Sequence, residues 1–112
     1  MYQAAFMFRP GPTDADFEAF TAQINACANR LGGFLGEENW QSPDGSLRLA
    51  IYYWADRASL DVFVRDPIHR KAKTRQAEWY KGYHVVVSEV VSSYGDGRLP
   101  HPTGDSRRER RT

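Results

Sequence analysis

Apolar residues recur along the chain with two different periods, and the change from one period to the other predicts its secondary structure. The first run, YQAAFMF at residues 2–8, is short and aromatic and is followed by the turn-forming residues RPGP. This pattern is typical of a buried strand that ends in a turn. In residues 13–33, apolar side chains recur at spacings of three and four, which predicts a helix with one apolar face. That face consists of Phe17, Phe20, Ile24, Cys27, Ala28 and Leu31.

The second half of the chain predicts a hairpin, two more helices and a last strand. Two runs at residues 34–42 and 47–54 flank the sequence PDGS, whose turn chemistry indicates an antiparallel hairpin. Asp56 is expected to begin a helix that ends before Pro67, because proline disfavours a helical residue ahead of it. Asp66 and Pro67 suit the start of a third helix, which Gly82 would end. The β-branched run from there to about residue 94 predicts the final strand.

The predicted order is therefore β-α-β-β-α-α-β, within an α+β domain that covers residues 1–95. Such a unit usually forms a four-stranded antiparallel sheet with its helices on one face. The chain has no further element to cover the other face, so we expect a second copy to cover it, sheet against sheet, in a homodimer. Residues 96–112 are rich in Gly, Pro and Arg and have little to bury. They predict a disordered basic tail.

Composition and charge narrow the possible partners. The 112 residues carry a formal net charge of +1, and residues 96–112, with five Arg against two Asp and one Glu, account for +2 of it. The remaining −1 on residues 1–95 argues against nucleic-acid binding. No apolar run approaches the roughly 20 residues that span a bilayer, and no leader precedes the first strand, so we expect a cytoplasmic protein that does not bind membranes. The single Cys27 excludes a disulfide within one chain.

His69 is the candidate catalytic residue. It falls in the first turn of the predicted third helix, at the edge of the apolar stripe, where the helix dipole opposes protonation. A neutral imidazole beside an apolar pocket could act as a general base. Alternatively, His69 could hydrogen-bond near Asp66 and hold the corner between two helices. The sequence carries no phosphate-binding loop, nucleophile elbow or metal-ligand spacing, so it predicts neither a metal nor a cofactor.

The aromatic content, 13%, is unusual in its chemistry, since many of the rings carry polar edges. A plain core favours Leu, Ile and Phe, because a buried Tyr or Trp must find a hydrogen-bond partner. A pocket for a flat, partly polar ligand between the sheet and the helices would explain this choice. The aromatic residues concerned are Trp40, Tyr52, Tyr53, Trp54, Phe63, Trp79, Tyr80 and Tyr83.

Three segments resemble the antibiotic biosynthesis monooxygenase (ABM) family. They are Tyr53-Trp54-x-Asp56, the corner Asp66-Pro67-x-His69-x-x-Ala72, and Trp79-Tyr80-x-x-Tyr83, within a similarity that covers residues 1 to about 95. The resemblance implies a ferredoxin-like unit that dimerises into an α+β barrel, in agreement with the element order.

The resemblance implies several alternative activities. Some ABM proteins oxygenate phenols or quinols with O₂ and no cofactor, and for such a reaction His69 would be the base. The substrate-binding residues would be Trp54, Phe63 and Trp79 as aromatic walls, and Tyr53 or Tyr83 as the source of a hydroxyl. Other members degrade haem, but the first strand here lacks their Asn, and Phe63 stands where they have a Trp. The expected function is cofactor-independent monooxygenation of a small phenol or quinol. The alternative is a dimer without catalytic activity that binds a small molecule, such as haem, or acts in a stress response.

Overall fold

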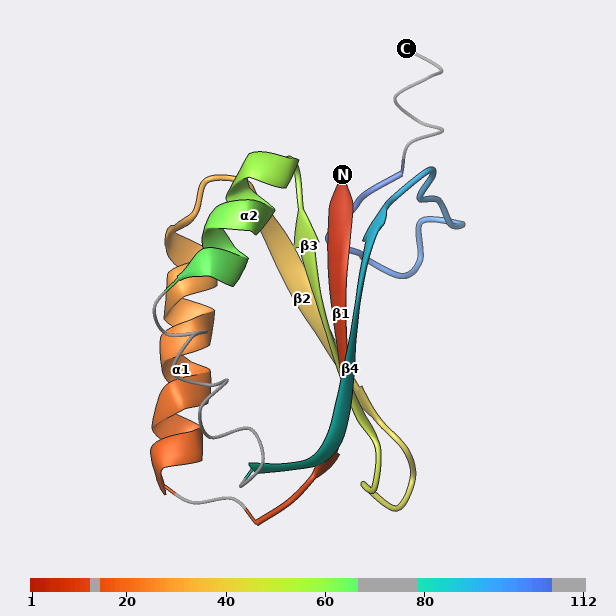
Figure 1. The fold of residues 1–112 in the computed structure, drawn as a ribbon. Helices are drawn as coiled ribbons and strands as arrows, with labels where there is room; N and C mark the ends of the chain where they lie inside the picture. Colours follow the sequence, from red (N-terminus) through yellow and green to blue (C-terminus); the bar gives the residue numbers. More distant parts are fainter. Residues whose placement is uncertain (13–14, 67–78, 106–112) are drawn as a thin grey trace.

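The protein is a four-stranded antiparallel sheet with two helices packed against one of its faces (Figure 1). The computed structural model describes residues 1–12, 15–66 and 79–105. The elements follow the order β1 (Tyr2–Pro10), α1 (Ala15–Arg30), β2 (Phe34–Gln41), β3 (Arg48–Trp54), α2 (Arg57–Arg65) and β4 (Tyr80–Glu89). The predicted α+β class and the four-stranded antiparallel sheet are confirmed.

The strands lie in the order β2-β3-β1-β4, so the first strand is central and pairs with both β3 and β4. Because side chains alternate between the faces of a strand, the register divides each strand into two sets. The even-numbered residues of β1 and β3, such as Ala4 and its partner Tyr52, lie on the face toward α1 and α2. We call this the helix face. The opposite face, which carries Ala5 and its partner Ile51, is the outer face.

The hairpin between β2 and β3 closes through the predicted turn. Gly45 has a φ of +73°, a left-handed conformation that glycine adopts without strain. One carboxylate oxygen of Asp44 accepts hydrogen bonds from the Ser42 hydroxyl at 2.7 Å and from the Ser46 backbone N–H at 3.0 Å. These bonds hold the pKa of Asp44 at about 2, below its ordinary value. The turn therefore fixes the register of the hairpin.

Helix α2 begins where the sequence predicts. Asp56 is its N-cap, with a carboxylate oxygen that accepts a hydrogen bond from the backbone N–H of Ser59 at 2.7 Å. The helix ends at Arg65, before Pro67. Its start also lies against the loop after α1, where the backbone N–H of Ala55 donates to the carbonyl of Gly33 at 2.7 Å. This contact sets α2 against the end of β3.

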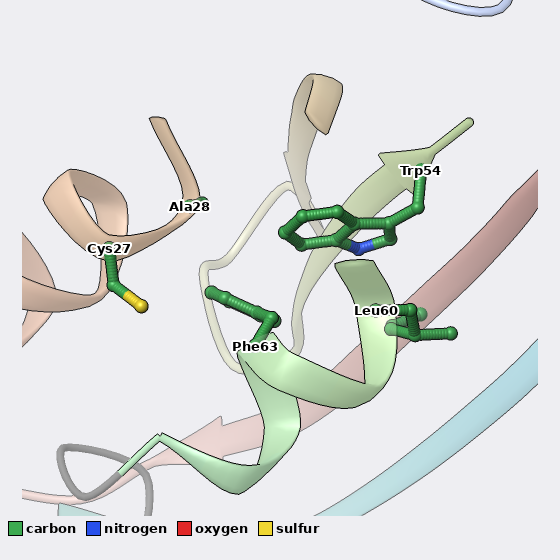
Figure 2. Packing of buried hydrophobic residues seen from close by; sticks show 6 residues of the cluster. Cys27, Ala28, Trp54, Leu60 and Phe63 are labelled. Atoms are coloured by element: carbon green, nitrogen blue, oxygen red, sulfur yellow. The ribbon is translucent and has the colours of Figure 1, made fainter. Parts of the chain in front are cut away.

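The core lies where the end of α1 meets α2 over β3 (Figure 2). The Trp54 side chain is fully buried, and its ring centre is 4.8 Å from that of Phe63 on α2. The other members of the cluster are Leu60 from α2, Cys27 and Ala28 from α1, and Ala4 from β1. The Cys27 thiol donates a hydrogen bond to a carboxylate oxygen of Asp66 at 3.2 Å, which joins α1 to the end of α2. The apolar face predicted for α1 is therefore the face it buries.

The last part of the chain differs from the sequence prediction. The sequence predicts a helix that continues to Lys81 and stops at Gly82, whereas β4 already begins at Tyr80 and pairs Gly82 with Arg9. This boundary was wrong because pairing with β1 overrides the local signal of a glycine. The strand ends at Glu89, earlier than predicted. Most of the predicted third helix, residues 67–78, lies outside the described residues.

Residues 90–105 run from β4 onto the outer face. The His101 ring is 4.9 Å from that of Tyr53, and a Cβ added to Gly36 would come within 2.9 Å of the Pro102 ring. Part of the segment predicted to be a disordered tail therefore contacts the sheet. Residues 106–112 lie outside the described residues. Among the described helices, none is long and apolar enough to cross a membrane.

Candidate functional site

An open cavity of about 750 Å³ lies between the helix face and the two helices. All four strands and both helices contribute to its described lining, which is mostly apolar and aromatic. The cavity lies there because α1 and α2 both lie on the same side of the sheet (Figure 1) and pack together around Trp54 at the end of β3. A cavity of this size and character suits a small organic ligand.

The register of the sheet builds the floor of the cavity in rows. One row crosses all four strands and contains Gln41, Arg48, Phe8 and Tyr83. The next row contains Asn39, Ala50, Phe6 and Val85. All eight residues line the cavity. Aromatic rings therefore occupy the middle of the floor, and polar groups stand toward the side of β2.

A group of packed rings forms one wall of the cavity. The ring of Tyr80 is 5.3 Å from that of Phe6 and 5.0 Å from that of Phe8, both in edge-on geometry. Tyr83 packs on the same cluster at 5.7 Å from Phe6, and Phe17 of α1 approaches Tyr80 at 6.0 Å. Edge-on contacts of this kind favour rigid ring positions. The wall can therefore hold a flat ligand in a defined orientation.

Two tyrosines at the cavity, Tyr52 and Tyr80, favour the protonated form. Burial raises the pKa of Tyr80, and burial together with the Glu37 carboxylate raises the pKa of Tyr52 well above its usual range. The Tyr52 hydroxyl donates a hydrogen bond to the side-chain oxygen of Asn25 at 3.1 Å. At neutral pH these phenols are hydrogen-bond donors and would not act as bases. Among the described lining residues, the only charged side chain is that of Arg48.

The structure separates the residues that the sequence groups as ligand-binding. Phe63 and Tyr83 line the cavity. Trp54 and Trp79 are buried, and Trp79 packs on Phe17 and Phe20, rings that themselves line the cavity. Tyr53 lies on the outer face, away from these four. His69, the candidate base, lies outside the described residues, and the cavity position predicted for it stays a prediction.

Sequence reasoning missed a polar cluster on the outer face. The Tyr53 hydroxyl donates to a carboxylate oxygen of Glu38 at 2.6 Å, and Nε2 of His101 lies 2.5 Å from the same oxygen. On the other side of the imidazole, Nδ1 is 2.7 Å from the hydroxyl of Thr103, which is also bonded to Ser93. The hydrogen bond from Tyr53 is the main cause that lowers the pKa of Glu38, and His101 adds to it. The alternation of side chains in β3 could have revealed that Tyr53 and Trp54 face opposite ways.

No metal site emerges from the part of the chain that the structure describes. A group of three or more His, Cys, Asp or Glu side chains placed to hold an ion is absent from residues 1–12, 15–66 and 79–105. The polar cluster on the outer face contributes one imidazole and one carboxylate. What the helix-side cavity offers chemically is an aromatic surface, phenolic hydrogen-bond donors and one cation.

Comparison with known proteins relates this arrangement to an existing fold. No protein-family model matches the sequence, and no curated protein matches it. Solved structures do match. Rv0793 from Mycobacterium tuberculosis superposes with a TM-score of 0.68 and 16% identity, over 84% of this chain and 98% of that one.

Two further structures have names that describe an activity. SnoaB from Streptomyces nogalater, a cofactor-independent oxygenase, superposes with a TM-score of 0.66 and 16% identity, over 82% of this chain and 94% of that one. A protein described as an antibiotic biosynthesis monooxygenase superposes with a TM-score of 0.62 and 17% identity, over 81% of this chain and 99% of that one. The chain therefore has the fold of the ABM proteins, which the sequence resemblance implied. At these identities the likeness concerns the fold alone.

Proposed function

We propose that the protein is a cofactor-independent monooxygenase that oxidises a small phenol or quinol in the helix-side cavity. The observation that carries the proposal is the aromatic cavity of about 750 Å³, which all four strands and both helices line. It is supported by the fold shared with SnoaB, itself a cofactor-independent oxygenase. Phe63 and Tyr83 would contact the substrate, with Trp54 packed behind Phe63 and Trp79 packed behind Phe17.

The chemistry needs no electron source other than the substrate. A phenol loses its proton, and the electron-rich anion reacts with O₂ to form a carbon–oxygen bond at the ring carbon opposite the hydroxyl. Cleavage of the O–O bond in that peroxide, with loss of the ring hydrogen, gives a quinone and one water. The phenol is thus oxidised, while one oxygen atom enters the product and the other becomes water. The protein's tasks are to hold the anion, exclude water and donate hydrogen bonds to the reduced oxygen.

His69 would accept the phenolic proton, and Tyr52 and Tyr80 could not replace it because burial raises their pKa values. The test is O₂ consumption with a panel of naphthols and quinols on the wild type, His69→Ala and His84→Ala. His84 lies on the outer face and controls for the loss of an imidazole. We expect a loss of about 10²-fold or more in kcat for His69→Ala and little change for His84→Ala.

The outcomes separate the proposed oxygenase from a binding protein. Equal rates of O₂ consumption in the wild type and His69→Ala would contradict the proposal that His69 accepts the phenolic proton. Ligand binding without any O₂ consumption would establish a binding protein without catalytic activity, and an Ala50→Phe substitution should then block that binding, because Ala50 lines the cavity floor. A Soret band on titration with haem would instead favour haem binding.

We also propose that the protein is a homodimer joined through the outer faces of two sheets. Apolar side chains remain partly or largely exposed there on three strands: Ala5, Met7, Ile51 and Val86. In the adjoining segment, Val91 and Leu99 are 90% and 81% exposed. A second copy would cover these side chains and remove apolar area from water.

Light scattering coupled to gel filtration tests the dimer. Ile51→Asp places a charge at the centre of the proposed interface and should shift the protein to a monomer. Val62→Asp is the matched control, because Val62 is 54% exposed on α2, which does not contribute to that face. A monomeric wild type, or an Ile51→Asp variant that stays dimeric, would contradict the proposal.

A further inference from the structure

The helix-side cavity is apolar and aromatic except at one corner, where Arg48 stands at the start of β3. In the floor row, Arg48 lies between Phe8 on β1 and Gln41 on β2. Directly paired residues on one face of a sheet have Cβ atoms only about 5 Å apart. The cation, an amide and an aromatic ring therefore meet at the same edge of the cavity.

The three carboxylates nearest to Arg48 along the chain, Asp44, Asp56 and Glu38, are engaged elsewhere, and Asp56 caps α2. Asp44 accepts hydrogen bonds from Ser42 and Ser46 within the turn. Glu38 accepts from Tyr53 and contacts His101 on the outer face. Within the described ranges, the ion pairs are Arg57 with Asp61 and His101 with Glu38, and Arg48 takes part in neither. Its guanidinium is exposed and is available to an anion that enters from solvent.

We infer that Arg48 and Gln41 form an anion subsite, which selects flat aromatic ligands that carry a carboxylate or phenolate oxygen at one end. The inference rests on the proposed use of this cavity and names the substrate class. The aromatic body would lie on Phe8, and the far end would reach Tyr83. Arg48 and Tyr83 are two strand spacings apart, which is roughly 10 Å. That span suits a molecule of two fused rings with polar groups at its opposite ends.

This arrangement also suits the chemistry of the proposed reaction. A guanidinium remains charged at every working pH and binds a carboxylate or an oxyanion through paired N–H donors. Close to a phenolic oxygen, the cation would favour the phenolate, which is the form that reacts with O₂. Arg48 would then bind the ligand, and also increase the fraction of it that is ready to react.

Binding of 2-naphthoate and of its neutral isostere 2-naphthamide, measured by isothermal titration calorimetry, tests the subsite. The two probes share a shape and differ in charge. We expect the wild type to bind naphthoate about tenfold more tightly than naphthamide, as for a hydrogen bond to a charged group. Arg48→Gln should remove this preference, Arg48→Lys should retain part of it, and high salt should weaken it because the site is exposed.

Arg9→Gln is the matched control, since Arg9 is an exposed strand arginine whose odd-numbered position in β1 places it away from the helix face. It should bind both probes as the wild type does. Equal affinities of the wild type for the two probes, an unchanged preference in Arg48→Gln, or no binding of either probe would overturn the inference. If naphthoate is preferred in a way that depends on Arg48, but no phenol causes O₂ consumption, the anion subsite is supported. Only the proposed oxygenase activity is then contradicted.

Discussion

Tyr52 and Tyr53 are neighbours in β3, yet their side chains lie on opposite faces of the sheet. The Tyr52 hydroxyl bonds to Asn25 of α1 beside the open cavity. The Tyr53 hydroxyl bonds to Glu38 beneath the C-terminal segment. Burial is the first cause that raises the pKa of both phenols, and that of Tyr53 reaches about 12. Two identical side chains in adjacent positions thus belong to two different sites.

The two faces also differ in how their polar groups are satisfied. On the outer face, the polar groups of Tyr53, Glu38, His101 and Thr103 bond to one another. On the helix face, the cavity lining is mostly apolar, with polar side chains toward β2 and one cation, Arg48, that has no described ion-pair partner. The hydrogen-bond network on the outer face holds the C-terminal segment against the sheet. The cavity on the helix face, with this one charge, is instead suited to bind a ligand. The contrast fits the two proposals made above, a substrate site on the helix face and a dimer interface on the outer face.

Removal of the Trp54 side chain should have the largest effect on the free energy of unfolding, because the core lies on the helix face. Trp54→Ala empties a fully buried site between Phe34 and Phe63 and should cost about 3–5 kcal/mol of unfolding free energy. Trp40→Ala is the control on β2, where the side chain is 63% exposed, and should cost no more than about 0.5 kcal/mol. Urea denaturation followed by circular dichroism measures both. Similar costs would contradict the placement of the core.

Two adjacent glycines should respond differently to the addition of one methyl group. A Cβ on Gly33 would lie 2.7 Å from the Ser59 Cβ, and nearer still to the Ser59 hydroxyl, at the start of α2. Gly33→Ala should therefore destabilise the protein by about 1–3 kcal/mol, as overpacking does. Gly32→Ala meets nothing within 4 Å and should be neutral or stabilising by about 0.4–1 kcal/mol. Thermal unfolding of the two variants compares them, and equal melting temperatures would disprove the close contact.

A substitution on the outer face, Glu38→Gln, should have the smallest effect on the free energy of unfolding, and this effect should depend on pH. Hydrogen bonding holds the pKa of Glu38 below its ordinary value of 4.5 in the folded protein. The ionised carboxylate thus contributes stability above pH 4.5, and this contribution is lost as the pH falls below 4.5 through the folded pKa. Glu38→Gln should cost about 1 kcal/mol at pH 7 and less at pH 3.

Urea titrations of Glu38→Gln at several pH values between 3 and 7 test this dependence. Glu18→Gln, an exposed position on α1, is the control and should follow the wild type at every pH. If the difference between wild type and Glu38→Gln stays constant over this range, the hydrogen bond to ionised Glu38 does not stabilise the fold.

The sequence predicts those parts of the fold that depend on nearby residues. The PDGS turn, the cap at Asp56 and the apolar face of α1 are local, and each is found where the pattern indicates. The start of β4 was predicted wrongly because a glycine such as Gly82 can either end a helix or lie within a strand, and the neighbouring residues do not distinguish the two cases. Only pairing with Arg9 decides between the two.

The candidate site was predicted less completely, because it depends on contacts between distant residues. Glu38 and His101 are 63 positions apart, and no local pattern connects them. Arg48 was assigned no role, since a charge in an alternating strand usually faces solvent. Its relation to the cavity follows from the strand order, which places Phe8 on one side of it and Gln41 on the other.

The hydrogen bond between Cys27 and Asp66 has a consequence for the durability of the protein. Burial, followed by the Asp66 carboxylate, raises the pKa of this thiol above its ordinary value, and the side chain is only 3% exposed. Peroxides and disulfides react with the thiolate, so a thiol held protonated and out of reach oxidises slowly. The chain's only cysteine is thus protected from peroxides and disulfides in its surroundings.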